Sequence, residues 1–332
     1  MTTHTNIAIV GTEKSGKTSL TRALLKMPAE DYAPTTCASR HTLNENITLV
    51  DVPGNPKYNK TLCSSLTEAD ACILCISVIE DDRLLELLVI LQCFKIPCMA
   101  CVTSIDIEEE RLHKLFKLAG FPFAPRVVIL SGAEEVETLL RFPIVRGVDS
   151  GGLIAPILSV TQCAEGLLVS SVIHRGKVDA HVSELFLHPG GVAVKVLEVM
   201  RVSGRHVELL FRGEDRRLIS KGMILSDDPN IGKKQLKAEI AVIGRPPNGV
   251  KSGFVGVVNW LNMQTPMKIE IDTKIDKDTG DDVKTEVEPL VLNAGDHARV
   301  TLTSQGPPVA IFGRFLIRND NVVIAVGYAS ET

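Results

Sequence analysis

The sequence has no hydrophobic run long enough to cross a bilayer, because its longest apolar stretch, residues 84–94, is interrupted by Glu86 and Gln92. It also has no N-terminal signal peptide: the apolar run at residues 6–10 is short and leads directly into a glycine-containing loop. These absences argue against a membrane protein and against a secreted one. We therefore expect a soluble, cytoplasmic protein with no membrane partner.

No part of the chain carries a strong excess of positive charge. Its 332 residues include 36 Lys and Arg against 40 Asp and Glu, which gives a formal net charge of −4. This balance excludes a uniformly basic nucleic-acid-binding surface, so any RNA contact has to come from local patches. The length and the ordinary share of hydrophobic residues, 45%, predict two or three globular domains, and we expect a monomer.

The eight cysteines do not form a disulfide pattern. Most of them lie in the first third of the chain, several inside apolar runs, whereas disulfide-rich secreted domains are shorter and place cysteines in polar loops. The pairs Cys72/Cys75 and Cys98/Cys101 have the C-x-x-C spacing of zinc sites. Each pair falls inside a predicted strand, where residues i and i+3 point to opposite faces. We therefore predict free thiols packed in the core, with a zinc site as the alternative.

Up to about residue 140, short apolar runs alternate with segments of helical periodicity. Runs this uniformly apolar are typical of strands in a parallel sheet that is covered on both faces. The alternation predicts a doubly wound α/β domain with a mostly parallel sheet. The predicted strands are residues 6–10, 47–52, 71–79, 98–102 and 126–130, and the predicted helices are residues 17–26, 84–93, 108–118 and 133–140.

The pattern changes at residues 141–152, RFPIVRGVDSGG, which contain proline and several glycines and predict a linker. Short alternating strands follow, separated by glycine and proline, and they predict all-β barrels. With a second linker at residues 227–234, we expect domains at residues 1–142, 150–229 and 234–330. The predicted strands are residues 155–160, 166–172, 192–199, 206–211, 238–242, 297–304, 313–319 and 322–329.

Residues 272–288, DTKIDKDTGDDVKTEVE, have the composition of a calcium-binding loop. Such a loop needs glycine at its position 6 and glutamate at position 12. Counting from Asp276, Gly280 falls at position 5 and Val287 at position 12, so the spacing does not fit. We predict instead an exposed hairpin that turns at Thr279 and Gly280.

Residues 11–18, GTEKSGKT, match the phosphate-loop pattern G-x-x-x-x-G-K-[ST]. The motif follows a predicted strand and opens a predicted helix, which is the context that it requires. Its glycines let main-chain N–H groups curl around a phosphate, and the helix N-terminus adds a positive dipole. We expect Lys17 to reach the β- and γ-phosphates and Thr18 to bind Mg²⁺. The residues predicted to bind the nucleotide here are Gly11, Glu13, Lys14, Ser15, Gly16, Lys17 and Thr18.

Residues 51–54, DVPG, end the predicted strand 47–52 a short way after this loop. A carboxylate at this place can hold Mg²⁺ through water, so Asp51 is predicted to bind both the metal and the nucleotide. The N–H group of Gly54 is then placed to sense the γ-phosphate, and Asn55 follows it directly. Gly54 is therefore a candidate catalytic residue, and Asn55 becomes one through the family resemblance described below.

A guanine base is usually bound by N-K-x-D after a later strand, where the Asp carboxylate accepts hydrogen bonds from the base. In this chain, residues 103–106 are TSID, so only Asp106 matches, and Ser131 is placed to support the same base. Between Thr18 and Asp51, the segment YAPTTCASR offers Thr35, or its neighbour Thr36, as a further ligand of Mg²⁺ and the γ-phosphate.

Together these residues resemble the translational GTPases of the elongation factor Tu/1A class. The string NITLVDVPGNPKYNKTL resembles their second switch, RGEDRRLISKGMILS their second barrel, and residues 294–329 their third domain. Within the class, the chain resembles the selenocysteine-specific factors, and more narrowly the factor-like proteins of methanogenic archaea associated with pyrrolysine. The resemblance implies a P-loop GTPase domain followed by two all-β barrel domains, with GTP/GDP and Mg²⁺ as cofactors and aminoacyl-tRNA and the ribosome as partners.

The chain departs from the class at several positions. The class has a His after D-x-P-G that positions the attacking water, whereas this chain has Asn55. We therefore predict slow GTP hydrolysis, and we expect His41 to face solvent instead of replacing the missing side chain. Thr103 and Ser104 replace the Asn and Lys of the base-reading motif, and the first switch is much shortened.

Three functions are consistent with these residues. The first is a factor that delivers an aminoacyl-tRNA to the ribosome in its GTP state. The second is a nucleotide-binding regulator of the same fold without tRNA delivery or efficient hydrolysis, which the departures favour, including Ser220 and Lys221 in the barrel pocket that holds the terminal adenosine in the class. The third is a sulfate-activation subunit, which has a similar three-domain build. The likeness to selenocysteine factors continues through the third domain, which favours the first.

Overall fold

The computed structural model describes residues 4–28, 36–78, 82–103, 108–121, 125–129, 138–139, 146–212, 216–244, 246, 249–283 and 290–330. The chain divides into two compact units, Met1–Gly147 and Val148–Thr332. None of the helices in the described part of the chain has the length and apolar character that a membrane span requires.

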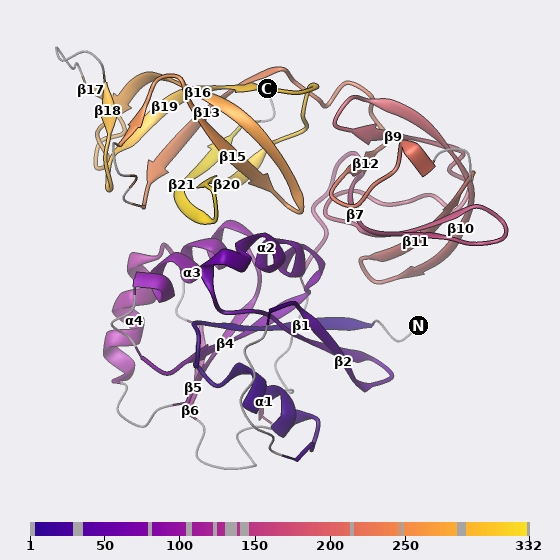
Figure 1. The fold of residues 1–332 in the computed structure, drawn as a ribbon, viewed down its shortest axis with the longest axis horizontal. Coiled ribbons are helices and arrows are strands. Elements are labelled where there is room, and N and C mark those ends of the chain that lie inside the picture. Colours follow the sequence, from indigo (N-terminus) through magenta and orange to yellow (C-terminus); the bar gives the residue numbers. More distant parts are fainter. Residues whose placement is uncertain are drawn as a thin grey trace. The chain divides into compact units, whose positions relative to one another are not determined.

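The first unit is built on a six-stranded sheet in the order β2-β3-β1-β4-β5-β6 (Figure 1). All neighbouring strands are parallel except β2 and β3. The central strands β4 and β5 are buried along their whole lengths, which is why their sequences are uniformly apolar. The predicted mostly parallel sheet is therefore confirmed. The strands are β1 (Thr5–Gly11), β2 (Ser39–Asn44), β3 (Ile47–Asp51), β4 (Ala71–Ile76), β5 (Cys98–Val102) and β6 (Arg126–Ile129).

Helices cover both faces of this sheet, with α1 on one side and α2 and α3 on the other (Figure 1). The helices are α1 (Lys17–Leu24), α2 (Asn59–Glu68), α3 (Asp82–Cys93) and α4 (Glu109–Leu118), and a short 3-10 helix, η1 (Pro56–Tyr58), precedes α2. The predicted helices 17–26, 84–93 and 108–118 are confirmed to within a few residues at their ends. Most of the predicted helix 133–140 lies outside the described residues.

Helix α2 was not predicted from the sequence. It is largely polar, and its apolar contacts with the core come from Leu62, Cys63 and Leu66. These three apolar residues span little more than one helical turn, which is too short for a helix to be recognised by its periodicity. The packing of this face against the unit, and not local propensity, therefore accounts for the helix.

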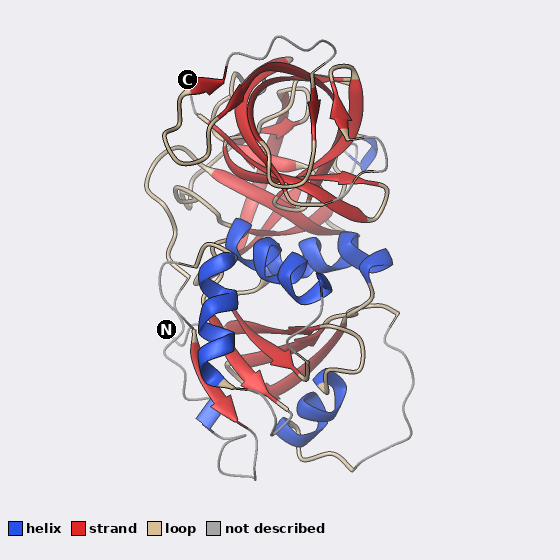
Figure 2. Cartoon of the chain, turned by 90° about the vertical axis from the view of Figure 1, so that its left-hand side faces the viewer, coloured by secondary structure: helices blue, strands red, loops and turns tan. Residues whose placement is uncertain are grey.

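The second unit contains two β-barrels. The first is closed, in the order β10-β11-β8-β7-β12-β9, and the pairing of β15 with β16 closes the second (Figure 2). The first barrel contains β7 (Ile154–Gln162), β8 (Leu167–Val172), β9 (Glu184–His188), β10 (Val192–Ser203), β11 (His206–Phe211) and β12 (Ile224–Ser226). The second contains β13 (Gln235–Val242), β15 (Phe254–Trp260), β16 (Met263–Ile275), β17 (Asp282–Val283), β19 (His297–Ser304), β20 (Gly313–Asn319) and β21 (Val322–Ala329). The short strands β14 (Val250–Lys251) and β18 (Val291–Leu292) pair with each other in a separate two-stranded sheet.

The two predicted all-β barrels are thus confirmed. Strands β11, β19, β20 and β21 have the predicted bounds, because each alternates between buried and exposed residues or ends at a clear turn. Strands β9, β15 and β16 were not predicted. The side chain of Asn262, in the turn between β15 and β16, donates to the Ile157 carbonyl oxygen at 2.7 Å and so ties the second barrel to the first within this unit.

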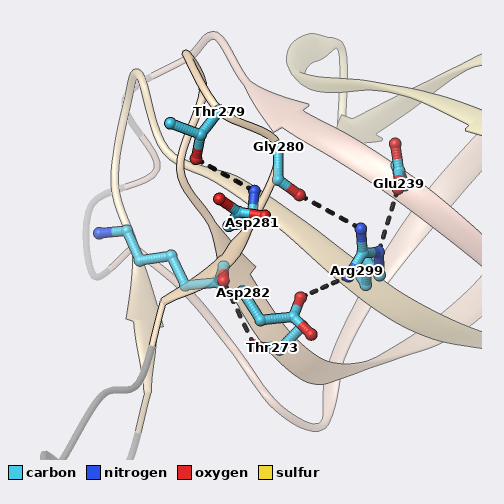
Figure 3. A network of polar contacts seen from close by, with 8 residues as sticks. Glu239, Thr273, Thr279, Gly280, Asp281, Asp282 and Arg299 are labelled. Atoms are coloured by element: carbon cyan, nitrogen blue, oxygen red, sulfur yellow. Dashed lines mark hydrogen bonds and ion pairs between the residues drawn. The ribbon is translucent and has the colours of Figure 1, made fainter.

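The charged segment after β16 forms the predicted hairpin, with Ile275 paired to Asp282 (Figure 3). Gly280 has φ of 76°, a left-handed conformation that suits glycine in a tight turn. Arg299 holds the hairpin: its guanidinium donates to the Asp282 carboxylate, to the Gly280 carbonyl oxygen at 3.3 Å and to Glu239 at 3.1 Å. Arg299 therefore pairs with two carboxylates, one in the hairpin and one on β13.

Arg146 anchors the end of the first unit, although it lies inside the predicted linker 141–152. Its side chain is buried and donates to three main-chain carbonyl oxygens: Leu66 at 3.1 Å, Ala69 at 3.4 Å and Phe94 at 2.8 Å. Leu66 and Ala69 lie at the C-terminal end of α2, and Phe94 follows α3. Carbonyl groups at a helix end have no partner within the helix, so one guanidinium satisfies acceptors on two helices.

We expect Arg146→Ala to destabilise the first unit by about 2–4 kcal/mol, because it leaves these buried carbonyl groups without their charged donor. Arg146→Lys should lose less than Arg146→Ala, because its ammonium still donates to some of the carbonyl groups, but it should not restore full stability, because it cannot reach all three. The measurement is urea unfolding followed by hydrogen exchange of α2 and α3, with Arg126→Ala on the exposed face of β6 as control. Equal midpoints for Arg146→Ala and the control would contradict this role.

Candidate functional site

The two predicted nucleotide motifs meet at one edge of the sheet in the first unit. The phosphate loop follows β1 and the DVPG turn follows β3, and these neighbouring parallel strands pair Ile9 with Asp51. On its other side, β1 pairs with β4, where Gly11 lies beside Cys75. The connections after β1 and β3 lead to helices on opposite faces of the sheet (Figure 1). Doubly wound sheets bind ligands at such a switch point.

Lys17 places a buried cation in the phosphate loop. It is the first residue of α1 and is 7% exposed. Its ammonium donates to the Thr12 carbonyl oxygen at 2.5 Å and lies 3.5 Å from Ser15 Oγ. Burial lowers the pKa of Lys17, and the negative charges of Asp51 and Glu13 oppose this shift. The loop can therefore offer a poorly hydrated cation to a phosphate group.

The loop closes tightly around this cation. Gly16 has φ of 84°, and a Cβ atom there would lie 3.2 Å from Thr103 Cγ2. Thr103 Oγ1 donates to the Ser15 carbonyl oxygen at 3.2 Å, and Ser15 is fully buried. Thr103, which replaces the Asn of the base-reading motif, thus supports the phosphate loop from the end of β5. Lys14 and Glu13 are exposed at the loop surface.

Asp51 and Thr18 form a direct pair across the site. Thr18 Oγ1 donates to Asp51 Oδ2 at 2.8 Å, whereas the buried Oδ1 has no hydrogen-bond partner among the described residues. Burial raises the pKa of Asp51, against the hydrogen bond from Thr18 and the charges of Lys17 and His41. Carboxylate and hydroxyl oxygens are the ligands that Mg²⁺ prefers, so an unsatisfied oxygen beside Thr18 fits the metal that the sequence predicted.

Gly54 brings the main chain directly against the phosphate loop. A Cβ atom on Gly54 would lie 2.7 Å from the Gly11 carbonyl oxygen and 2.7 Å from Lys17 Nζ. No side chain fits at this position. The Gly54 main chain therefore lies beside the Lys17 ammonium, which would face the terminal phosphate. This position is compatible with the prediction that the Gly54 N–H senses the γ-phosphate.

Asn55 uses both ends of its side-chain amide within the protein. Its Nδ2 donates to Glu13 Oε1 at 3.0 Å, and its Oδ1 accepts from the Lys57 N–H at 3.0 Å, capping η1. The first bond joins the turn after β3 to the phosphate loop. In this arrangement both polar ends of the Asn55 side chain are engaged within the protein.

Arg83 supports the same turn from helix α3, and the sequence did not single it out. Its Nε lies 3.4 Å from the Gly54 carbonyl oxygen, and its Nη1 binds Glu86 Oε2 at 2.6 Å. Its Nη2 donates to Asn59 Oδ1 at 2.7 Å, while Asn59 Nδ2 donates to Glu86 Oε1 at 3.1 Å. The available signal was the pair of opposite charges, Arg83 and Glu86, three residues apart near the start of a largely apolar helix.

His41 does not face solvent as expected. In β2, residues 39, 41 and 43 are half-buried while their neighbours are exposed, so His41 lies on the covered face of this edge strand. Its Nε2 lies 3.2 Å from Ser39 Oγ, and its charge lowers the pKa of Asp51. The sequence SRHTLN contains no signal for the face of this strand that packs inward.

The cysteines of β4 and β5 are buried in the core, as predicted. The sequence did not show that the two strands are in register, with Cys72 beside Cys98 and Cys75 beside Cys101. Burial, and then the neighbouring Cys98 thiol, raise the pKa of Cys72; the hydrogen bond with Cys101, and then burial, raise the pKa of Cys75. These thiols are therefore held protonated, as core residues.

Three predicted site residues lie outside the described residues: Thr35, Asp106 and Ser131. Their roles stay predictions. Thr36, the alternative to Thr35, is exposed. The structure brings together Lys17, Thr18, Asp51, Gly54 and Asn55, and adds Arg83 behind them.

Comparisons with known proteins agree with this geometry. Residues 6–104 match a family model described as 50S ribosome-binding GTPase. Elongation factor 1-alpha of Archaeoglobus fulgidus is 24% identical over 332 aligned residues, covering 85% of this chain and 78% of that protein. Elongation factor 1-alpha of Pyrococcus furiosus is 23% identical over 343 aligned residues, covering 86% of this chain and 79% of the relative.

Solved structures share the fold along the whole chain. Translation elongation factor SelB from Methanococcus maripaludis, in complex with the GTP analogue GppNHp, has a TM-score of 0.70 at 18% identity, covering 99% of this chain and 79% of SelB. A bacterial selenocysteine-specific elongation factor, EF-Sec, has a TM-score of 0.65 at 15% identity, covering 98% of this chain and 58% of that protein. At these identities the likeness establishes the fold.

We expect Asp51→Asn to raise the thermal stability of the ligand-free protein at pH 7 by about 1 kcal/mol, roughly 4 °C, because it removes a buried charge. The raised pKa of Asp51 means that the wild type loses stability as pH rises above the ordinary value of 3.8. The difference should therefore vanish below that pH. Calorimetric melts from pH 3 to pH 8, with the exposed Glu45→Gln as control, test this; a less stable variant at pH 7 would refute it.

Proposed function

We propose that this chain, a translation elongation factor-like GTPase of the elongation factor Tu/1A class, binds an aminoacyl-tRNA in its GTP state and delivers it to the ribosome. The observation that supports delivery is the extent of the likeness to SelB, which covers 99% of the chain and therefore includes both barrels. In the class, the second barrel holds the terminal adenosine of the tRNA. A nucleotide domain alone would not support this proposal.

The nucleotide would be bound at the switch point of the first unit. The N–H groups of the phosphate loop and the Lys17 ammonium face the phosphates, and the dipole of α1 adds positive potential. Thr18 and Asp51 would hold Mg²⁺, which supplies charge neutralisation between the β- and γ-phosphates. Outside the described residues, we assign Thr35 to the metal and Asp106 and Ser131 to guanine.

Hydrolysis would depend on how the attacking water is held. Water attacks the γ-phosphorus, the bond to the β-phosphate oxygen breaks, and GDP and phosphate leave. Catalysis of this step consists of positioning and of stabilising spreading negative charge. The Asn55 amide is neutral and is bound to Glu13 and Lys57, so we propose slow turnover.

A second function, a nucleotide-binding regulator without tRNA delivery, is favoured by two observations. The Asn55 side chain is engaged within the protein. In the exposed turn before β12, Ser220 stands where the class has an acidic residue in the adenosine pocket, and the basic Lys221 follows it. A regulator of this kind would act by protein contact in one nucleotide state.

Protection of the aminoacyl ester distinguishes the two functions. We expect purified protein with GTP to slow the spontaneous deacylation of a cognate aminoacyl-tRNA, tested with pyrrolysyl-, selenocysteinyl- and standard aminoacyl-tRNAs, and to give no protection with GDP. Protection with GTP supports delivery. Equal half-lives with and without protein for every tRNA would reject delivery and leave the regulator.

We expect Lys17→Ala to lose about 30- to 1,000-fold in nucleotide affinity, since a charge-assisted contact to two phosphates is worth about 2–4 kcal/mol. Calorimetric titration with GTP and GDP measures the change, and Lys117→Ala, exposed on α4, is the matched control. Unchanged affinity in Lys17→Ala would show that the loop is not the nucleotide site.

We expect Asn55→His to raise the rate of GTP hydrolysis by about 10²-fold or more in the presence of ribosomes, because a positioned group that orients water is typically worth about 10²–10⁴. Single-turnover hydrolysis of the wild type and the variant, with and without ribosomes, measures it. A wild type that already hydrolyses GTP as fast as Asn55→His would contradict our account of this site.

A further inference from the structure

Three groups around the ammonium of Lys17 lie where a third phosphate would have to enter. The Gly54 main chain is packed against Lys17 Nζ and the phosphate loop. Asn55 follows it and is bound to Glu13 Oε1 at 3.0 Å. Glu13 belongs to the loop itself, and its charge acts on Lys17. The turn and the loop are therefore joined by a bond that ends in a carboxylate.

The geometry points to Glu13 as the residue that sets the preference of this site for a nucleoside diphosphate over a triphosphate. This inference rests on the proposed nucleotide binding and extends it to the choice between the two ligands. A γ-phosphate would approach Lys17, on which the charge of Glu13 acts, and Gly54, whose neighbour Asn55 is bound to Glu13. A diphosphate ends before this position and does not meet the carboxylate.

Two separable effects follow from this placement. The first is electrostatic: Glu13 competes with the γ-phosphate for one ammonium and repels its charge. The second is steric: the bond from Asn55 holds the Gly54 turn against the loop and has to open when a third phosphate enters. Because Glu13 is exposed, salt screens the first effect, whereas the second does not depend on salt.

Glu13→Gln separates the two effects. The amide oxygen of Gln can still accept from Asn55 Nδ2, so the closing bond is kept and only the charge is lost. We expect this variant to gain about tenfold in affinity for a β,γ-imido GTP analogue relative to GDP. Asn55→Ala keeps the carboxylate and removes the bond, and we expect it to change the ratio less than threefold.

The experiment measures dissociation constants for GDP and the imido analogue by calorimetry, with excess Mg²⁺ and with EDTA, at low and high salt. The full chain is used, with Glu45→Gln in the exposed β2–β3 turn as a carboxylate control. We expect added salt to increase the affinity for the imido analogue relative to GDP in the wild type and in the control. The increase should be smaller in Glu13→Gln. Thermal melts without nucleotide establish that each variant is folded.

The outcomes are distinguishable from those of the proposed function. If wild type binds neither nucleotide, both proposals are wrong. If wild type binds nucleotide but Glu13→Gln has the wild-type ratio at every salt concentration, only the role of Glu13 is wrong. An Asn55→Ala ratio equal to that of Glu13→Gln would assign the preference to the bond and overturn the role of the charge.

Discussion

The contact between the Gly54 main chain and the phosphate loop is the constraint on which the site depends. A Cβ atom on Gly54 would lie 2.7 Å from atoms of Gly11 and Lys17, so the turn reaches the loop only because this residue has no side chain. The parallel pairing of β1 with β3 makes the approach possible, since it ends both strands at one edge. The Arg83 guanidinium, from helix α3, then contacts the carbonyl oxygen of Gly54.

The charges of the site are arranged around a single buried ammonium. Burial lowers the pKa of Lys17 and so disfavours its charged form, while the negative charges of Asp51 and Glu13 favour it. Asp51 is itself buried with one oxygen unsatisfied, so the ligand-free site holds charges that the protein does not fully pair. A phosphate chain with its metal ion, as proposed above, would complete this pairing.

The sequence predicted those parts of the fold and the site that depend on local signals. The phosphate loop and DVPG were recognised because short fixed spacings carry their chemistry, and the buried strands because uniformly apolar runs of their length are typical of a covered parallel sheet. Helix α2 has too few apolar residues to show a period. Arg83, the inward face of His41 and the register of Cys75 with Cys101 depend on which elements become neighbours in space. No local pattern contains that information.

Helix α2 runs between the candidate site and the end of the first unit. Its 10 residues span about 15 Å. Its first residue, Asn59, is bound by Arg83, and the carbonyl groups at its last turn hold Arg146. Because Arg146 also binds the end of α3, the two helices are fastened to each other at both ends. A displacement of the Gly54 turn, which Arg83 contacts, would therefore act on a pair of helices fastened at both ends, and through them on Arg146, one residue before the end of this unit.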